Sequence, residues 1–354
     1  MTEGAGGPTV LQVLPALGGG GVERGTVDLA AFLAREGWNP VVASGGGPLE
    51  ARLAEVGASH VALPLHSKNP AVIARNAGRL RRLIRERGVR LVHARSRAPA
   101  WSAWLAARAC GVPFVTTFHG VYGGENAGRL KRLYNGVMAR GERVIAISEY
   151  VAEHVRARYG VAPGRLRVIH RGVDVAAFDP AAVGGERVAA LARRWGVEPR
   201  TKVVMLPGRV TRIKGHLLLL RALARLPRRD YVCLFVGGFE AGASYVREIE
   251  AAIEAGGLGG IARLVGPCDD MPAALRLAHV VAAPSVGPEA FGRVSVEAQA
   301  MGRPVIVTDV GGLGETLMPA ATGWLVPPGD VDELARALQL ALDMGDDVRA
   351  RLAI

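Results

Sequence analysis

Cysteine, lysine and long apolar runs are all scarce in this chain of 354 residues. The three cysteines, Cys110, Cys233 and Cys268, lie far apart without C-x-x-C spacing, which supports neither a disulfide framework nor a zinc site. No apolar run approaches the roughly 20 residues that a membrane-spanning helix requires, so we expect no transmembrane segment. The first eight residues lack the basic stretch and apolar core of a secretion signal, and we therefore expect a cytoplasmic location.

Positive charge is concentrated in the first half of the chain. The net charge is +12, yet residues 1–195 hold 27 basic against 14 acidic side chains, whereas the remainder holds 17 against 18. Only four of the basic residues are lysines, so arginine dominates. A basic first half favours an acidic partner, such as a phosphorylated substrate, an anionic membrane surface or nucleic acid.

Short β-branched runs alternate with helical patterns along the whole chain. Continuous Val and Ile runs separated by helices are typical of parallel sheets covered on both faces. Because the chain exceeds the size of a single core, we expect an α/β protein of two doubly wound, Rossmann-like domains, residues 1–180 and 181–354. The expected strands are residues 10–14, 40–44, 60–63, 91–94, 114–118, 143–147, 166–169, 202–206, 231–236, 261–265, 280–283, 304–308 and 323–326.

Two loops of the first half carry candidate ligand-binding residues, because ligands of open α/β sheets bind beyond the carboxyl ends of the strands. The sequence LPALGGGGVERG places Gly19, Gly20 and Gly21 between a strand and a helix. Free N–H groups can meet an anion there, a merely flexible turn being the alternative. In VTTFHG, His119 ends a strand, where it can hydrogen-bond a sugar or phosphate or serve a structural role.

Two loops of the second half carry charged candidates. In VVMLPGRVTRIKGH, Arg209 and Lys214 can converge on a pyrophosphate, a solvated basic loop being the alternative. In GPEAFGRVSVEAQAMG, Glu289 lies in a loop and Glu297 in a helix expected over residues 293–301. The N–H groups around residues 291–294 would lie in its first turn and be aimed at an anion or sugar. Paired carboxylates there suit a ligand with phosphates and vicinal diols, although Glu297 alone would be an ordinary helix-surface residue.

The sequence PPGDVDEL contains Asp330 and Asp332 at the spacing that some sugar transferases use for a divalent metal. Asp330 stands where a helix N-cap belongs, and Glu333 three residues later would complete a capping box. We therefore expect helix capping and no metal at this position.

Together these motifs resemble the retaining glycosyltransferases of family 4, which have the GT-B fold. The resemblance covers nearly the whole chain and rests on GGGGVERG, TFHG, VIHRGVD, PGRVTRIKG and, most specifically, the E-x7-E element of PEAFGRVSVEAQAMGRPVIVTDVGGLGE. It implies two Rossmann-like domains facing each other across a cleft, with the acceptor bound by the first and the nucleotide sugar by the second. The chain departs from the family pattern at Arg171, where many relatives have asparagine.

The resemblance also implies a role for each candidate residue. Arg209 and Lys214 would bind the donor diphosphate, Glu289 and His119 the donor sugar, and Glu297 the ribose. The implied catalytic residues are thus His119, Arg209, Lys214 and Glu289. The implied donor-binding residues are Gly19, Gly20, Gly21, Gly266, Pro267, Phe291, Gly292, Arg293, Val294 and Glu297, with the base near Gly266 and Pro267. The resemblance implies an enzyme that works without a metal. It also implies no cofactor, because the nucleotide sugar is itself a substrate.

The implied activity is transfer of a hexosyl group from a UDP- or GDP-sugar to a lipid-linked or phosphorylated glycan, in cell-envelope or lipopolysaccharide synthesis. One face of an amphipathic pattern holds Arg75, Arg79, Arg82 and Arg85/Arg87, which is compatible with peripheral contact at an anionic inner membrane surface, a solvated face being the alternative. A sugar-nucleotide epimerase or phosphorylase of the same fold is the alternative enzyme. A second alternative is a non-enzymatic module that binds nucleic acid through the basic first half. The lack of a recognisable reading helix or exposed aromatic platform argues against it, so we expect no nucleic-acid partner.

Overall fold

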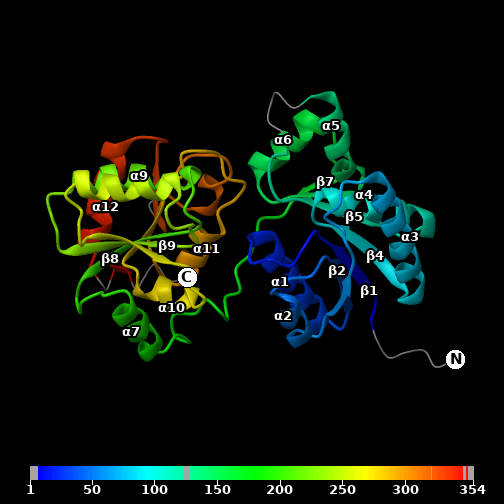
Figure 1. Cartoon of the computed structure of the whole chain (residues 1–354), viewed down its shortest axis with the longest axis horizontal. Helices are drawn as coiled ribbons and strands as arrows, with labels where there is room; N and C mark the ends of the chain where they lie inside the picture. Colours follow the sequence, from blue (N-terminus) through cyan, green and yellow to red (C-terminus); the bar gives the residue numbers. More distant parts are fainter. Residues whose placement is uncertain (1–6, 123–127, 320, 346–347, 350–354) are drawn as a thin grey trace. The chain divides into compact units, whose positions relative to one another are not determined.

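The chain folds into two compact units, Met1–Arg171 and Gly172–Ile354, each built on one parallel sheet (Figure 1). The computed structural model describes residues 7–122, 128–319, 321–345 and 348–349. All the expected strands are present, each within two residues of its predicted bounds, and this confirms the α/β class.

The first unit contains a seven-stranded sheet. Its strands are β1 (Thr9–Val13), β2 (Asn39–Ser44), β3 (Ser59–Ala62), β4 (Val89–Ala94), β5 (Phe114–Phe118), β6 (Arg143–Ala146) and β7 (Leu166–Val168). They pair in parallel in the order β3-β2-β1-β4-β5-β6-β7, so the direction of winding reverses between β1 and β4. This reversal marks the place where an open α/β sheet binds ligands.

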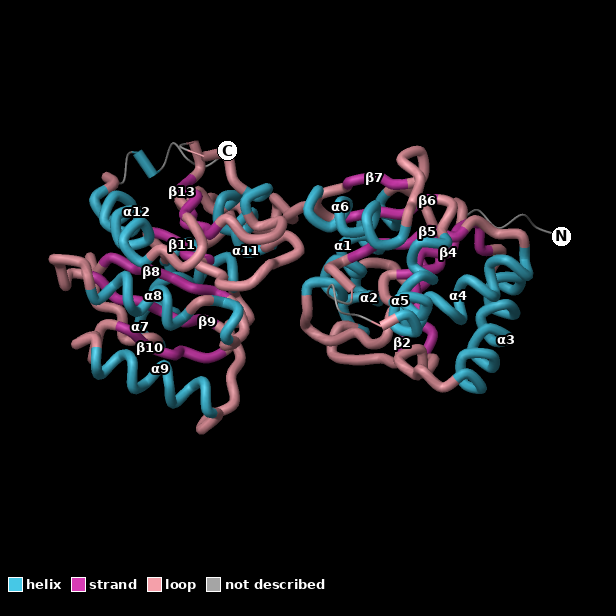
Figure 2. Tube along the Cα trace, turned by 90° about the horizontal axis from the view of Figure 1, so that it is seen from above, coloured by secondary structure: helices cyan, strands magenta, loops and turns pink. Residues whose placement is uncertain are grey.

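Helices cover both faces of the first sheet. They are α1 (Gly21–Arg35), α2 (Glu50–Glu55), α3 (Pro70–Glu86), α4 (Arg97–Cys110), α5 (Arg129–Asn135), the 3₁₀ helix η1 (Gly136–Arg140) and α6 (Glu149–Tyr159). Helix α3 begins where the Asn69 side chain accepts from the Ala71 N–H at 2.9 Å and Pro70 fits the first helical turn. It lies alongside α4 (Figure 2) and buries Leu80 and Ile84, which leaves its arginines exposed.

The second unit contains a six-stranded sheet in the order β10-β9-β8-β11-β12-β13, all parallel. Its strands are β8 (Lys202–Pro207), β9 (Tyr231–Val236), β10 (Ala262–Gly266), β11 (Val280–Ala283), β12 (Val305–Thr308) and β13 (Gly323–Val326). Its helices are α7 (Gly185–Arg194), η2 (Arg212–Lys214), α8 (His216–Ala224), α9 (Ser244–Ala255), α10 (Met271–Leu277), α11 (Arg293–Ala300), η3 (Gly314–Thr316) and α12 (Val331–Asp343). Here the winding reverses between β8 and β11.

Both faces of the second sheet are apolar, as continuous Val and Leu runs predict. Val204 and Leu206 of β8 pack with side chains of α8 and α12, whereas Val203 and Met205 pack with α7 and α10 on the other face. Side chains alternate in this way because successive strand residues point to opposite faces. Within the described residues, no helix is both long and apolar enough to span a bilayer.

Asp330 caps helix α12, but the predicted capping box is only half formed. The Asp330 carboxylate accepts from the Glu333 N–H at 2.9 Å. The Glu333 carboxylate pairs with Arg336 instead of returning to Asp330, whose own N–H donates to the Pro327 carbonyl. The reciprocal half of the prediction was therefore wrong, because an arginine one turn along competes for the same carboxylate.

Candidate functional site

Lys214 and Glu289 meet where the winding of the second sheet reverses. The loops after neighbouring strands β8 and β11 carry these two residues. Lys214 Nζ donates to Glu289 Oε1 at 2.9 Å and to Oε2 at 2.8 Å, and the side chains are 28% and 14% exposed. Since ligands of open α/β sheets bind at such reversals, the ion pair stands at the expected binding position.

The main chain fixes the two loops that carry this ion pair. The Val286 N–H donates to the Ile213 carbonyl at 2.8 Å. Gly215 has a φ of 76°, and a Cβ there would lie 1.8 Å from the Pro284 carbonyl oxygen. Only glycine fits a left-handed position against another backbone. The position of Lys214 relative to Glu289 is therefore set by backbone contacts.

Sequence reasoning missed the polar residues that hold the Glu289 carboxylate. The buried Ser285 hydroxyl donates to Glu289 Oε1, and the Ser285 carbonyl accepts from Thr308 Oγ1 at 2.6 Å. The signal that could have found Ser285 is its place two residues after a buried strand and four residues before Glu289. Thr308 has a comparable place at the end of β12.

Arg209 follows β8 and its side chain is exposed. Two backbone approaches connect this loop to the next strands: the Gly237 N–H donates to the Gly266 carbonyl at 2.8 Å, and a Cβ on Gly237 would lie 1.9 Å from the Gly208 carbonyl oxygen. Gly266 ends β10 with a φ of 78°, and Pro267 after it is exposed. Arg209 and Gly266 thus share the carboxyl edge of one sheet. Gly237 is a further residue that the sequence analysis missed.

Helix α11 begins at Arg293, as the helical composition over residues 293–301 predicts. Gly292 is its N-cap with a φ of 97°, so Arg293 and Val294 open the helix. The expectation that the Phe291 amide lies in the first turn was wrong, because the chain enters the helix through a left-handed glycine. A Cβ on Gly292 would lie 2.3 Å from Leu313 Cδ1, and Phe291 itself is buried.

Glu297 is a buried residue and not a helix-surface glutamate. It is 6% exposed and lies one turn after Arg293, whose Nε is 3.2 Å from Glu297 Oε1. Buried carboxylates are rare unless they are paired. Its burial removes the simplest structural explanation, that of a solvated surface charge.

The glycine loop of the first unit follows β1 and leads directly into α1. Gly20 is the N-cap with a φ of −78°, Gly21 is the first helical residue, and a Cβ on Gly19 would meet nothing within 4 Å. A Cβ on Gly20 would lie 2.6 Å from Glu23 Oε2, so a carboxylate of the first turn already stands beside this helix end. The space over Gly19 stays open for close approach by a ligand.

His119 lies just after β5 and contacts Arg171, the last residue of the first unit. Arg171 Nη1 is 3.1 Å from His119 Nδ1, and Arg171 Nη2 donates to the Gly21 carbonyl. His119 Nε2 is buried and has no hydrogen-bond partner among the residues that the structure describes. The sequence analysis noted Arg171 only as a departure from the family pattern.

The charges around His119 keep its ring neutral. Burial and then the neighbouring Arg95, Arg171 and His93 hold the pKa of His119 well below its ordinary value. Arg95 is also buried, and its Nη1 donates to Gln12 Oε1 at 3.1 Å. Burial, followed by Arg171, lowers the pKa of Arg95 to about 9. Arg95 follows β4 directly, a position that could have identified it from the sequence.

These features define a two-unit, doubly wound α/β protein with charged binding loops at the carboxyl edges of its sheets. Two family models match the chain: Glycosyltransferase Family 4 over residues 19–177 and Glycosyl transferases group 1 over residues 201–344. A glycosyltransferase from Rickettsia africae ESF-5 is 36% identical, with a TM-score of 0.89 over 98% of this chain and 91% of that one. The chain therefore belongs to the family 4, group 1 glycosyltransferases and has their GT-B fold, which confirms the resemblance.

Two further proteins are similar to this chain. The D-inositol 3-phosphate glycosyltransferase of Salinispora arenicola is 36% identical over 289 residues, which are 74% of this chain and 63% of that protein. The chain thus spans slightly less than two thirds of the length of this curated relative. Anabaena HepE, crystallised in complex with UDP and glucose, is 22% identical with a TM-score of 0.83 over 98% of this chain and 93% of HepE, and shares the fold.

Proposed function

We propose that this protein transfers a hexosyl group from a nucleotide sugar to a glycan or polyol acceptor with retention at the anomeric carbon. The observation that carries the proposal is the Lys214–Glu289 ion pair at the reversal of the second sheet. The Lys214 ammonium suits a diphosphate and the Glu289 carboxylate suits sugar hydroxyls, and the two groups lie side by side. Arg209, exposed on the same loop as Lys214, adds a second cation.

In this mechanism Lys214 and Arg209 offset the charge that grows on the departing nucleoside diphosphate. An ammonium has three N–H donors, so Lys214 can keep its contact with Glu289 and still donate to a phosphate oxygen. Fixed donors aimed at developing charge are worth about 100- to 1000-fold in rate. Glu289 would accept from sugar hydroxyls and Glu297 from the ribose, and the first amides of α11 would contribute N–H donors.

The test is calorimetric titration of the protein with UDP-, GDP- and ADP-sugars. UDP-glucose is the first choice because HepE was crystallised with UDP and glucose. We expect one nucleotide class to bind, and we expect Lys214→Met to weaken that binding without abolishing it. The Arg212→Met variant is the matched control, because Arg212 pairs with Glu248 on the surface nearby. No heat from any nucleotide sugar would contradict the proposal.

An epimerase or phosphorylase of the same fold would also bind the donor. Product analysis without acceptor separates these activities. Epimerised donor or free sugar phosphate would favour them, whereas unchanged donor that is consumed only when acceptor is added supports transfer.

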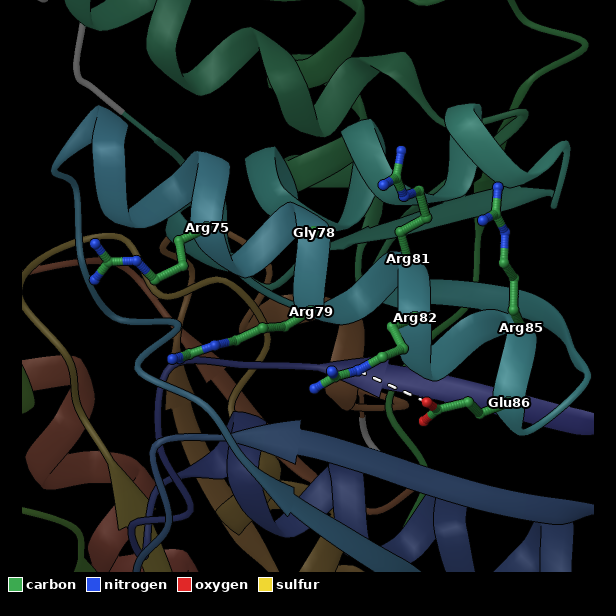
Figure 3. A pocket seen from close by; sticks show the side chains of 7 residues that line it. All are labelled: Arg75, Gly78, Arg79, Arg81, Arg82, Arg85 and Glu86. Atoms are coloured by element: carbon green, nitrogen blue, oxygen red, sulfur yellow. Dashed lines mark ion pairs between the residues drawn. The ribbon is translucent and has the colours of Figure 1, made fainter.

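We propose a phosphorylated or lipid-linked acceptor, bound by the basic first unit at the inner face of the cell membrane. The similarity to a D-inositol 3-phosphate glycosyltransferase supports an acceptor with phosphate. Helix α3 supports membrane contact, because exposed arginines surround a hollow on its surface (Figure 3). These are Arg75, Arg79, Arg81, Arg82 and Arg85, with Glu86 3.7 Å from Arg82.

Co-sedimentation with vesicles tests the membrane contact. Each arginine near an anionic surface is worth about 1 kcal/mol, so replacing Arg79, Arg82 and Arg85 by glutamine should weaken binding to anionic vesicles about 100-fold. Replacing the exposed Arg193 and Arg194 of α7 is the control in the second unit. Equal binding to zwitterionic and anionic vesicles would show that the arginines form only a solvated face.

A further inference from the structure

We propose that Arg171 is a positioning residue for His119: its guanidinium occupies Nδ1 and leaves Nε2–H as the ring's donor to a sugar hydroxyl. The inference rests on the proposed glycosyl transfer and assigns to His119 a contact with a sugar hydroxyl of a substrate. The contact joins residues 52 positions apart, at the carboxyl ends of β5 and β7.

The direction of the hydrogen bond follows from the chemistry of the two groups. A guanidinium has five N–H donors and no acceptor, so at 3.1 Å the His119 Nδ1 must be the acceptor. A neutral imidazole that accepts at Nδ1 carries its proton on Nε2. Arg171 also donates to the Gly21 carbonyl at the start of α1, so its planar guanidinium ties the ring to that helix.

The Nε2–H of His119 is a buried and unsatisfied hydrogen-bond donor. Nε2 lies out of contact with solvent, and the described residues provide it with no hydrogen-bond partner. A buried unpaired donor is unfavourable, and a hydroxyl oxygen that accepts from it relieves that penalty. The sequence also leaves room for Arg171, because a Cβ on Gly25 would lie 2.5 Å from Arg171 Nη2.

Burial and the neighbouring positive charges disfavour a second proton on the His119 ring. Arg95 follows β4, His93 lies within β4, Arg171 follows β7, and Tyr122 accepts from the His119 backbone N–H at 3.4 Å. With Arg171 in place, the pKa of His119 is lowered by burial and by both arginines. Removing Arg171 takes away one of these charges and opens Nδ1 to protonation.

The first test is a double-mutant cycle of Arg171→Met, His119→Ala and the double variant, measured as kcat/KM for the donor. We expect Arg171→Met to lower kcat/KM about tenfold in the wild-type background, as for the loss of a charged hydrogen bond. In the His119→Ala background it should change kcat/KM less than twofold, because Arg171 acts through His119. Equal losses in both backgrounds would overturn the proposal.

The second test follows the His119 ring by nitrogen NMR as pH is lowered, with His119→Ala used to assign the signals. In the Arg171→Met variant we expect the His119 ring to take up its second proton at a higher pH than in the wild-type protein. Arg171→Lys should titrate like wild type, because it keeps the charge, yet lose activity, because a single ammonium cannot hold both Nδ1 and the Gly21 carbonyl. Superimposable wild-type and Arg171→Met titrations would contradict the proposal.

A control variant and a ligand-free measurement separate failure of this proposal from failure of the proposed function. Arg90→Met is the matched control, since Arg90 is exposed at the opposite end of β4. This variant should alter neither kcat/KM nor the titration of His119. The titration requires no nucleotide sugar. Absence of transfer by the wild-type protein would therefore count against the proposed function, whereas the titration would still decide whether Arg171 governs His119.

Discussion

The two sheets share the order 3-2-1-4-5-6 over six strands, yet they hold their candidate residues in different ways. In the second unit the main chain joins the loops, through the Val286 N–H and the close approach of Gly215 to Pro284. In the first unit the Arg171 side chain connects the segment after β7 to His119 and to Gly21. The two sheets thus have the same topology, but backbone contacts fix the site of the second unit, whereas a single side chain positions the residues of the first.

The two sites also differ in how their cations are satisfied. Lys214 donates to a carboxylate, whereas Arg171 donates to a neutral ring nitrogen and a carbonyl oxygen. The sequence has the same asymmetry, since residues 1–171 hold 24 basic against 11 acidic side chains. We infer that the first unit retains its positive field for an acidic acceptor, whereas the second balances its cations with glutamates until a diphosphate arrives.

The largest expected effect is on stability, from Gly215→Ala. A Cβ would lie 1.8 Å from a backbone oxygen at a left-handed position, so we expect a loss of roughly 3–5 kcal/mol in the free energy of unfolding. Gly259→Ala is the control, because its Cβ would meet nothing within 4 Å. Chemical denaturation measures both. If Gly215→Ala were as stable as Gly259→Ala, the main chain would not be what fixes the second site.

The next effect is on catalysis, from Lys214→Met. We expect kcat to fall about 100- to 1000-fold, because a donor to the leaving diphosphate is lost. The fold should persist, since the loops are joined by backbone contacts that do not involve the lysine side chain. Steady-state kinetics and thermal unfolding separate the two outcomes. Activity within threefold of wild type would remove Lys214 from the proposed mechanism.

Glu297→Gln should weaken donor binding about tenfold, the difference between a charged and a neutral acceptor for ribose hydroxyls. Glutamine conserves the size of this buried side chain, so packing against α11 neighbours is retained. Calorimetry with the nucleotide sugar measures the change, and Glu248→Gln on the surface is the control. Unchanged donor affinity would remove the ribose role.

Strand positions and binding loops could be predicted because both depend on short stretches of sequence. The β-branched runs specified every strand, and the loops after β8 and β11 contain the residues that meet there. The side-chain contacts between these loops could not be predicted from the sequence. Lys214 and Glu289 are 75 residues apart, and His119 and Arg171 are 52 apart, so their contacts depend on sheet order and loop geometry.

The two local errors had a different cause. The Phe291 amide and the Glu333 carboxylate were both misplaced at helix starts, where one residue decides the outcome. Gly292 takes a left-handed φ that leaves the Phe291 amide outside the first turn of α11, and Arg336 competes with the backbone for Glu333. Composition alone does not specify either choice, because glycine is compatible with several conformations and a carboxylate with several donors.

The smallest expected effect is a pH dependence of stability that originates at His93, a buried residue of β4 in the first unit. His93 is 7% exposed, its Nε2 is 2.8 Å from Thr117 Oγ1, and burial followed by Arg95 lowers its pKa to about 3. Below pH 6.5 the unfolded chain binds a proton that the folded chain does not, so the free energy of unfolding should fall as pH drops from 6.5. The slope is at most about 1.4 kcal/mol per pH unit for this residue.

Urea denaturation at pH 7.5, 6.5 and 5.5 measures that slope. His93→Gln should make it shallower, whereas His66→Gln, on the surface of the same unit, should leave it unchanged. Above pH 7 neither variant should alter the pH dependence, because His93 is neutral in both states there. An unchanged slope in His93→Gln would show that His93 does not set the response of the first unit to acid, because Arg95, with a pKa of about 9, stays protonated in both states over this range.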